Sequence, residues 1–387
     1  MESIYYGRHY VDKKDIKIVS NALTQNLITT GKYVKKFEKS LKTYLKSKYV
    51  LSCSSGTAAI HLALMAINLK KNDIIIMPAI NFIASYNLSN YMNAKIYLAD
   101  VDPLTGQMTP ETLTDCIKKN KIKKIKAFIT MYLGGYPENI IEFYKLKKKF
   151  NCFLIEDACH ALGAKYKHAN KYFPVGSCYH SDICTFSLHP VKTITTGEGG
   201  IVSTNNVNLF KKILYLRSHG IIRSKLFYWK YQVNEIGFNY RISDINCALG
   251  LSQLKKINQF INYRKRIFNF YQKEFSKYKN LISIPKYKND YKPSYHLSVI
   301  SFNFKKMNTT KNKFLKFFEK NKIFFQFHYI PIYKFKVFNS KRIKYKNTEY
   351  YYKNTVSLPI YFNLNLDLQS KIIKKIKFFL KLNKETK

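Results

Sequence analysis

Between residues 48 and 205, short apolar runs alternate with segments of helical periodicity. Seven of these runs have the length and the β-branched and aromatic content of strands, and they cover residues 49–53, 74–79, 94–100, 125–133, 152–157, 182–187 and 200–204. Residues 57–67 and 137–150 lie between such runs and have helical spacing. Strands separated by helices predict βαβ units around a mostly parallel, buried sheet, in which ligands gather at the carboxyl ends of the strands.

The pattern changes in the second half of the chain. Residues 243–280 have the periodicity of one long helix or a pair, and after residue 285 short strands such as 295–304 alternate with lysine-rich helices. We therefore predict a large domain at residues 1–255. Residues 256–387 are predicted to form the long connecting helix and a small C-terminal α+β domain.

The composition is that of a globular protein with a full core. The chain has 387 residues, of which 46% are hydrophobic, and it contains no run of 18 apolar residues that would predict a membrane span. The N-terminal residues lack the charged and apolar segments of a secretory signal. The seven cysteines are scattered and form no C-x-x-C pair, so we expect reduced thiols in a cytoplasm, without a disulfide framework or metal site.

The net charge of +44 is the most unusual property of the chain. It raises the possibility of a nucleic-acid or other polyanion partner. However, seven of the 67 basic residues are arginines, which nucleic-acid readers favour, and the lysines are dispersed. Ile, Asn, Tyr and Phe are also plentiful, as an AT-rich gene would produce. A solvated basic surface is the favoured interpretation, with polyanion binding as the alternative.

The first stretch with candidate chemistry is S-S-G-T-A-A at residues 54–59, which follows a strand and opens a helix. Gly56 lets the backbone approach a ligand closely. The free N–H groups of Thr57 and Ala58 would then point, with the helix dipole, at an anion. A plain helix cap explains the same residues equally well.

The second stretch is L-I-E-D-A-C-H-A-L-G-A at residues 154–164. An apolar strand delivers Asp157 to its carboxyl end, and His160 follows three residues later. A carboxylate at this place could pair with a protonated ring nitrogen. The alternative is an N-cap aspartate together with a histidine whose hydrogen bonds are satisfied.

The third stretch, S-L-H-P-V-K-T-I-T-T-G-E-G-G at residues 187–200, isolates one lysine among glycines and threonines. Burial near other cations lowers the pKa of a lysine, and the neutral amine of Lys192 could form a Schiff base. Ser187 is available to bind a phosphate. The fourth stretch, residues 237–245, places an Asn and an Arg before the long helix and is by itself only a polar loop.

Together the four stretches supply an anion cradle, a carboxylate for a ring nitrogen, a Schiff-base lysine and further phosphate donors. This set matches the requirements of pyridoxal 5′-phosphate, because the carboxylate keeps the pyridine protonated as an electron sink while the lysine holds the aldehyde. The sequence therefore predicts a pyridoxal-phosphate enzyme.

The order of motifs resembles the DegT/StrS family of pyridoxal-phosphate-dependent sugar aminotransferases over nearly the whole chain. The motifs are YYGRHYVDKKD, LITTGKYVKKFE, SSGTAAIHLA, EDACHALGA, SLHPVKTITTGEGG, LRSHGI, FNYRISDINCALGLSQL, HYIPIY and SLPIYFNL. Their combination looks closest to the pseudaminic acid branch, whose members transfer an amino group from glutamate to C4 of a UDP-linked 4-keto-6-deoxy-N-acetyl-hexosamine. The implied fold is the type I aminotransferase, with a mixed, mainly parallel seven-stranded sheet in the large domain.

The resemblance also implies roles for individual residues. Lys192 would bind the cofactor and then act as general base and acid of the 1,3-proton shift. Asp157 would pair with the pyridinium nitrogen, His160 would approach the phenolic oxygen, and Phe82 would stack on the ring. The cofactor phosphate would be held by Thr57, Ala58 and Ser187, with Asn239 reaching it from the neighbouring subunit of an obligatory homodimer.

The resemblance places the nucleotide-sugar against a further set of residues: Tyr6, Asn26, Leu27, Ile28, Thr29, Gly56, His328, Tyr329, Ile330 and Pro331. Two residues depart from the family pattern, because Leu188 stands where Phe is usual and Asn81 where Thr is common. Cys159 replaces a small Ala or Ser and is interpreted as neutral. Three alternatives remain: a different nucleotide-linked keto-sugar as substrate, a sugar dehydratase (which has His in place of the lysine), and a non-catalytic polyanion-binding or regulatory relative.

Overall fold

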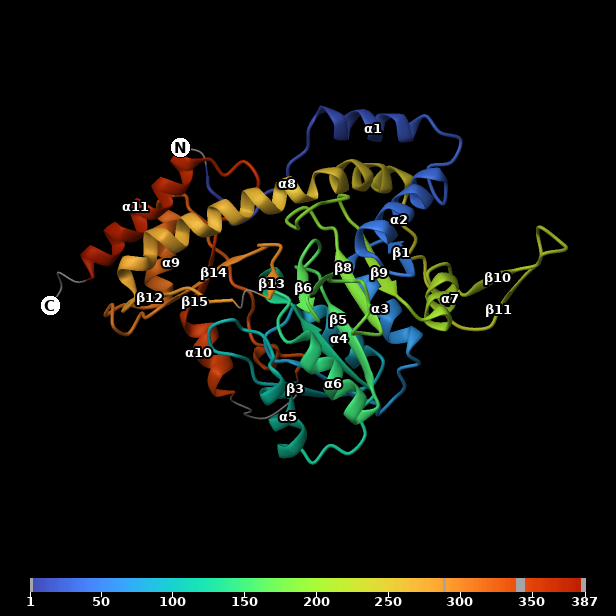
Figure 1. Ribbon diagram of the computed structural model, residues 1–387, viewed down its shortest axis with the longest axis horizontal. Helices are drawn as coiled ribbons and strands as arrows, with labels where there is room; N and C mark the ends of the chain where they lie inside the picture. The colour runs from blue at the N-terminus through green and yellow to red at the C-terminus, as the bar shows by residue number, and fades with distance from the viewer. Residues whose placement is uncertain (1–2, 288–289, 339–344, 384–387) are drawn as a thin grey trace.

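The computed structural model describes residues 3–287, 290–338 and 345–383, and a seven-stranded sheet forms its centre (Figure 1). The strands lie in the order β1 (Tyr49–Cys53), β9 (Gly200–Thr204), β8 (Ile183–Ser187), β5 (Phe153–Asp157), β4 (Ala127–Met131), β2 (Ile74–Pro78) and β3 (Lys95–Ala99). Strand β9 runs antiparallel to β1 and β8, and the other neighbours are parallel. The prediction of a mixed, mainly parallel seven-stranded sheet is confirmed, and each strand lies within its predicted range.

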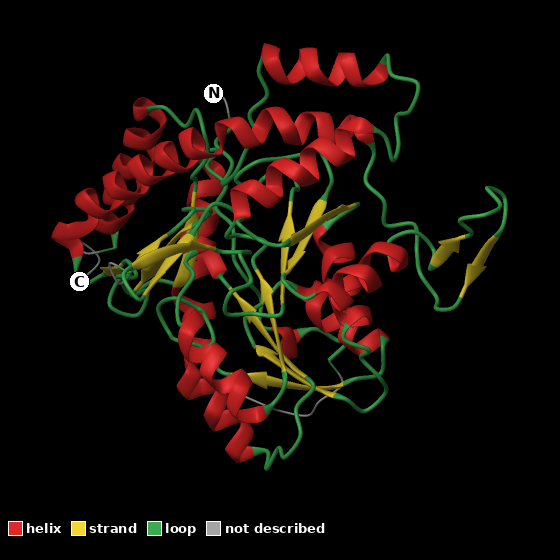
Figure 2. Cartoon of the chain, turned by 45° about the vertical axis from the view of Figure 1, so that its right-hand side comes forward, coloured by secondary structure: helices red, strands yellow, loops and turns green. Residues whose placement is uncertain are grey.

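Helices cover both faces of this sheet (Figure 2). Successive side chains of a strand point to opposite faces, so Ile183 of β8 packs into one apolar core while the next residue, Cys184, packs into the other. The helices of this part of the chain are α2 (Lys32–Leu45), α3 (Gly56–Ala66), α4 (Ile83–Tyr91), α5 (Pro110–Lys119), α6 (Ile140–Phe150) and α7 (Val207–Leu216). Helices α3 and α6 correspond to the two predicted helical segments.

The predicted long helix is α8 (Asp244–Phe275), which ends five residues before the predicted range does. Its N-terminal half contributes to the core beneath the large sheet, whereas Ile267 and Phe275 belong to a separate apolar core. That second core contains a three-stranded antiparallel sheet and helices on it, namely β12 (Ile282–Ser283), β14 (Ser298–Phe302), β15 (Thr355–Leu358), α9 (Lys311–Lys320) and α11 (Leu366–Leu382). The predicted division at residues 255/256 stays a prediction.

The remaining elements lie at the margins of the two cores. Helix α1 (Lys13–Leu23) runs alongside α8 (Figure 1), where Lys256 Nζ lies 2.6 Å from the buried carboxylate of Asp15. The others are α10 (Lys346–Asn354), the three-stranded sheet of β6 (Lys165–His168), β7 (Lys171–Pro174) and β13 (Tyr291–Lys292), and the hairpin of β10 (Ile221–Arg223) and β11 (Tyr231–Val233). Within the described residues, no helix has the length and apolar character to cross a membrane.

The first turn of α8 binds the segment that leads into α2 through hydrogen bonds. Helix α2 has Gly31 as its N-cap, which offers no side-chain acceptor. The buried carboxylate of Asp244 serves as the missing cap. It accepts hydrogen bonds from the N–H groups of Gly31 (2.6 Å), Tyr33 (2.7 Å) and Val34 (3.3 Å). The Asp244 N–H in turn donates to the carbonyl of Ile28 at 2.8 Å. The backbone and side chain of one residue distant in sequence therefore hold residues 28–34 in place.

Asp244→Ala is expected to lower the free energy of unfolding by about 2–4 kcal/mol, because three backbone donors lose a charged, buried acceptor at a helix N-terminus. Denaturant unfolding of the variant measures the change. The matched control is Asp367→Ala, which removes an exposed aspartate from the first turn of α11 and should change stability by less than about 0.5 kcal/mol. Equal effects of the two substitutions would contradict the capping role of Asp244.

Candidate active site

A cavity of about 590 Å³ opens at the carboxyl ends of the strands, between the large sheet and the small domain. Three of the four predicted stretches meet in it. The cavity is lined by eleven of the predicted site residues: Tyr6, Gly56, Thr57, Phe82, Asp157, His160, Ser187, Lys192, His328, Tyr329 and Ile330. Parallel strands bring these stretches together because they deliver their carboxyl ends to the same edge of the sheet.

Glycine at position 56 permits the closest of these approaches. A Cβ atom on Gly56 would lie 2.8 Å from Ser187 Cβ and 3.3 Å from Cys159 Sγ, and real Cβ atoms do not approach other carbons at the first of these distances. The start of α3, the end of β8 and the turn after β5 can therefore pack in direct contact. This packing assembles the floor of the cavity.

The prediction that the Ala58 N–H is free is wrong in this structure. Ser55 is the N-cap of α3, and its hydroxyl accepts a hydrogen bond from that N–H at 3.0 Å. This is the helix-cap alternative that the sequence left open. Thr57 is exposed and lines the cavity, so its N–H and hydroxyl remain the candidates at this helix terminus.

Asp157 ends β5 as a buried carboxylate with weak partners. Its oxygens accept hydrogen bonds from the Cys159 N–H at 3.2 Å and from the Ser85 hydroxyl at 3.4 Å. Burial raises the pKa of Asp157, and hydrogen bonds from Cys159 and the charge of Lys192 oppose this. Among the described residues the carboxylate thus has no bonded cation, and a protonated ring nitrogen in the cavity would supply one.

Lys192 lies in the loop after β8 and lines the same cavity. Burial lowers the pKa of its amine, while Cys159 and Asp157 act in the opposite direction. A lowered pKa increases the neutral fraction, which is the nucleophilic form. The turn that follows holds the loop in place, because the hydroxyl of Thr195 donates to the carbonyl of Leu188 at 2.9 Å.

His160 is held as a neutral ring in one orientation. Its Nδ1 accepts the N–H of Gly134 at 3.3 Å, so its proton is on Nε2, which lies 2.9 Å from the hydroxyl of Tyr329. Burial is the main reason why the pKa of His160 falls well below its usual value, and the charge of Lys192 adds to the shift. The ring can therefore donate one hydrogen bond toward the cavity.

Two further histidines of the small domain line the cavity near His160. The rings of His160 and His296 lie 4.3 Å apart, and Nδ1 of His296 is buried without a hydrogen-bond partner among the described residues. Burial and the charge of Lys192 lower the pKa of His328 to about 3. His296 was not among the predicted site residues, because its only signal in the sequence was a histidine at the start of a predicted strand.

His328 is expected to make the protein less stable in acid. Because its pKa is lowered on folding, the unfolded chain binds one more proton below about pH 6.5, and stability falls as pH falls. Between about pH 7.5 and 5 the loss from this residue amounts to about 2 kcal/mol. Denaturant titrations of the wild type and His328→Asn across this range measure the difference. The same pH dependence in both proteins would contradict a neutral buried His328.

The other predicted site residues lie elsewhere. Ala58 is buried behind the cavity wall, and Pro331 is buried next to Ile330. Asn239 and the segment 26–29 lie outside the cavity of their own chain, and Thr29 pairs in an isolated β-bridge with Ser243, four positions after Asn239. Of the two departures from the family pattern, Leu188 is fully buried in the core beneath the sheet, whereas Asn81 lines the cavity.

The residues of this cavity fit pyridoxal phosphate. Both amide atoms of Asn81 are buried and have no hydrogen-bond partner among the described residues, so they are available to a bound group. Phe82 is 51% exposed and offers a ring face to a planar ligand. Asp157 and Lys192 match the ring nitrogen and the aldehyde. No cluster of histidine, cysteine and acidic side chains suitable for a metal ion occurs in the described part of the chain.

The fold and this cavity define a pyridoxal-phosphate-dependent aminotransferase of fold type I. The sequence profile of the DegT/DnrJ/EryC1/StrS aminotransferase family matches residues 9–377, and the chain belongs to this family. The resemblance in the sequence motifs is thereby confirmed.

Three known proteins show how far the similarity extends. The UDP-4-amino-4,6-dideoxy-N-acetyl-beta-L-altrosamine transaminase of Campylobacter jejuni strain 81-176 is 36% identical over 367 residues, 94% of each chain. A GDP-perosamine synthase of Escherichia coli O157:H7 is 33% identical over 323 residues, 83% of this chain and 84% of the other. The structure of Helicobacter pylori PseC, an aminotransferase involved in the biosynthesis of pseudoaminic acid, superimposes with a TM-score of 0.87 at 29% identity, covering 98% of this chain and 100% of the other.

Proposed function

We propose that the protein transfers an amino group from glutamate to C4 of a UDP-linked 4-keto-6-deoxy-N-acetyl-hexosamine. One observation carries the reaction: Lys192 and Asp157, from different strand ends, line a single cavity in a chain of the aminotransferase family. The sugar is supported by the end-to-end similarity to the Campylobacter jejuni transaminase.

Pyridoxal phosphate supplies an electron sink for the carbon that loses its proton. Lys192 would hold the cofactor, and its free amine would move the proton between the two carbons of the 1,3-shift. Its lowered pKa suits this work, because a neutral amine accepts the proton. Asp157 would keep the ring nitrogen protonated as its counter-charge, and His160 would approach the phenolic oxygen with the Nε2–H that lies near the Tyr329 hydroxyl.

The nucleotide-sugar is proposed to enter from the side of the small domain. Tyr6, His328, Tyr329 and Ile330 line the cavity on this side. The hydroxyl of Tyr329 already lies 2.9 Å from His160 Nε2, so a substrate that contacts Tyr329 also meets the hydrogen-bond system of the cofactor site. Phe82, whose ring centroid lies 5.7 Å from that of Tyr329, would stack on the cofactor ring beside the sugar.

The identity of the nucleotide-sugar is tested by comparing UDP- and GDP-linked 4-keto-6-deoxy-sugars as amino acceptors. The enzyme is first converted to its amine form with glutamate. We expect the UDP-linked N-acetyl sugar to have the higher kcat/KM. A higher kcat/KM for the GDP-linked sugar would contradict the proposed substrate. It would favour the main alternative, the activity named for the Escherichia coli relative. Both outcomes leave the aminotransferase class unchanged.

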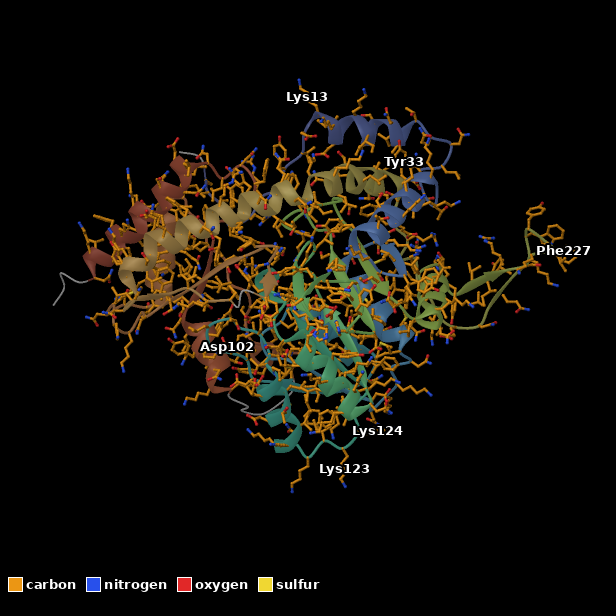
Figure 3. The ribbon with its side chains drawn as sticks, viewed as in Figure 1. Lys13, Tyr33, Asp102, Lys123, Lys124 and Phe227 are labelled. Carbon is orange, nitrogen blue, oxygen red and sulfur yellow. The ribbon has the colours of Figure 1, made fainter. Side chains whose placement is uncertain are left out.

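A homodimer with shared sites is part of this proposal. Asn239 and residues 26–29 lie outside their own cavity, so their proposed contacts with the cofactor phosphate and the sugar have to be made in a neighbouring subunit. The β10–β11 hairpin projects from the body and carries Phe227 at its tip (Figure 3), and Tyr228 and Trp229 next to it are 86% and 63% exposed. Apolar surface of this kind is typical of an interaction site.

Shared sites predict complementation between two inactive variants. Lys192→Ala removes the amine from each subunit's own cavity, and Asn239→Ala removes the contribution to the partner. In an equal mixture after subunit exchange, half of the dimers contain one complete site, so activity should recover to about a quarter of the wild-type value. Residual activity that equals the sum of the separate variants would contradict sharing through Asn239.

We place the protein in the cytoplasm, in keeping with seven free cysteines. The polyanion-binding alternative rests on the net charge of +44. Binding driven by counterion release weakens steeply with salt, so retention on heparin or DNA is expected to be lost near physiological ionic strength. Retention that survives this salt would favour the alternative.

A further inference from the structure

Arg264 is a buried cation without a buried anion. It lies in the middle of α8, is 2% exposed, and forms no ion pair with a carboxylate among the described residues. Burial lowers the pKa of its guanidinium to about 10, which still leaves it charged at neutral pH. Burying a charge without a counter-charge opposes folding, so hydrogen bonds have to offset this cost.

Within the described residues, the hydrogen bonds of Arg264 all go to backbone carbonyls of three different segments. Nη1 donates to the carbonyls of His296 at 3.2 Å and Ile360 at 2.8 Å. Nη2 makes a longer hydrogen bond, at 3.5 Å, to the carbonyl of Lys192. A planar guanidinium with five donors can reach three acceptors at fixed angles, which a lysine ammonium on a flexible stem cannot reproduce.

Two of these three segments contribute a side chain to the cavity, and the third is bonded to another residue of its wall. The first is the loop of Lys192 itself, which belongs to the large domain. The second precedes β14 and carries His296, whose ring lines the cavity. The third follows β15, and there the Ile360 N–H donates to the carbonyl of Tyr6 at 3.0 Å, so the link continues to another residue of the cavity wall.

We propose that Arg264 is a positioning residue for Lys192, which fixes the lysine's backbone from behind the cavity and ties its loop to the two small-domain segments that face it. It touches neither cofactor nor substrate. The proposal rests on the proposed role of Lys192 in proton transfer. Geometry explains the benefit, since displacing a proton-transfer group by about 1 Å costs about 100-fold in rate.

The experiment compares the wild type with Arg264→Lys and a control on the same helix. Arg264→Lys keeps the charge but carries its three donors on a single nitrogen, which cannot take the places of both Nη1 and Nη2. The control is Tyr271→Phe, which removes a buried hydrogen bond of 2.9 Å from α8 to the carbonyl of Pro359, next to Ile360, without any contact to Lys192. Each variant loses a hydrogen bond between α8 and the residues that follow β15.

The first readout uses the protein before any turnover. Pyridoxal phosphate is added to the cofactor-free proteins, attachment is followed by absorbance, and borohydride reduction locates the modified lysine. We expect Arg264→Lys to attach the cofactor to Lys192 about 10- to 100-fold more slowly than the wild type. Tyr271→Phe should stay within about 2-fold of the wild type.

The second readout is the glutamate half-reaction with glutamate deuterated at Cα. If Arg264 positions the base, the transfer of that proton becomes more rate-limiting in Arg264→Lys, and the isotope effect rises while the KM for glutamate changes little. A loss of stability alone would lower activity without raising the isotope effect. In Tyr271→Phe the isotope effect should equal that of the wild type.

The proposal is overturned if Arg264→Lys attaches the cofactor at the wild-type rate, or if Tyr271→Phe slows attachment equally. It is also overturned if Arg264→Lys does not fold, because Arg264 then serves the stability of the whole chain. Failure of the proposed function gives a different pattern, in which the wild type itself attaches the cofactor elsewhere or does not react with glutamate.

Discussion

Lys192→Ala is expected to lower amino transfer by at least about 10⁴-fold, because the substitution removes both the attachment point of the cofactor and the group that moves the proton. The variant should still bind pyridoxal phosphate through the cradle at Gly56 and Ser187, but reversibly. Single-turnover absorbance and borohydride trapping measure the two effects separately.

The control for this prediction is Lys123→Ala, since Lys123 is exposed (Figure 3) and precedes β4, whose opposite end contributes Met131 to the cavity. The control should keep wild-type activity and retain the cofactor on the peptide that contains Lys192. If borohydride still fixes the cofactor to that same peptide in Lys192→Ala, the assignment of the lysine is wrong.

Asp157→Asn is expected to lower amino transfer by at least about 10³-fold, because a neutral amide cannot keep the ring nitrogen protonated. The carboxylate is buried, with no cation bonded to it among the described residues, so its removal leaves the fold largely unaffected while the cofactor loses its counter-charge. Steady-state kinetics and the absorbance of the bound cofactor are the measurements.

Glu156→Gln provides a matched control from the preceding position. Glu156 is equally buried, and burial raises its pKa as well, but it points to the opposite face of β5, where Tyr132 and Ser181 donate to its oxygens at 2.6 and 3.0 Å. Its replacement should change stability by about 1–2 kcal/mol without changing kcat more than a few-fold. A larger loss of kcat in Glu156→Gln than in Asp157→Asn would contradict the assignment of Asp157.

The central sheet could be predicted because its strands are buried on both faces and read as continuous apolar runs. The peripheral hairpins could not. The β6–β7 hairpin turns through Ala169 and Asn170 at positive φ, and an Ala-Asn pair lacks the Asn-Gly signal of such turns. Strands β10 and β11 are largely exposed, so no apolar alternation marks them.

The catalytic cluster was predictable for a related reason. Asp157, His160 and Lys192 each follow a recognisable strand, and parallel strands bring their ends together. The residues that support the site from behind, Asp244 and Arg264, were not predictable, because their roles depend on contacts between distant segments. Asp244 caps a helix that begins about 210 positions earlier, and Arg264 resembles any basic residue of an amphipathic helix until its burial is known.

Amino transfer to a UDP-linked keto-sugar is the reaction proposed for this cavity. The most direct measurement is a single absorbance cycle on the purified protein. The enzyme is loaded with pyridoxal phosphate, converted to the amine form with glutamate, freed of glutamate, and given the UDP-4-keto-6-deoxy-N-acetyl sugar. We expect the absorbance band of the lysine-bound cofactor to disappear with glutamate and to return with the sugar. A band that never forms, or that glutamate does not change, would contradict it.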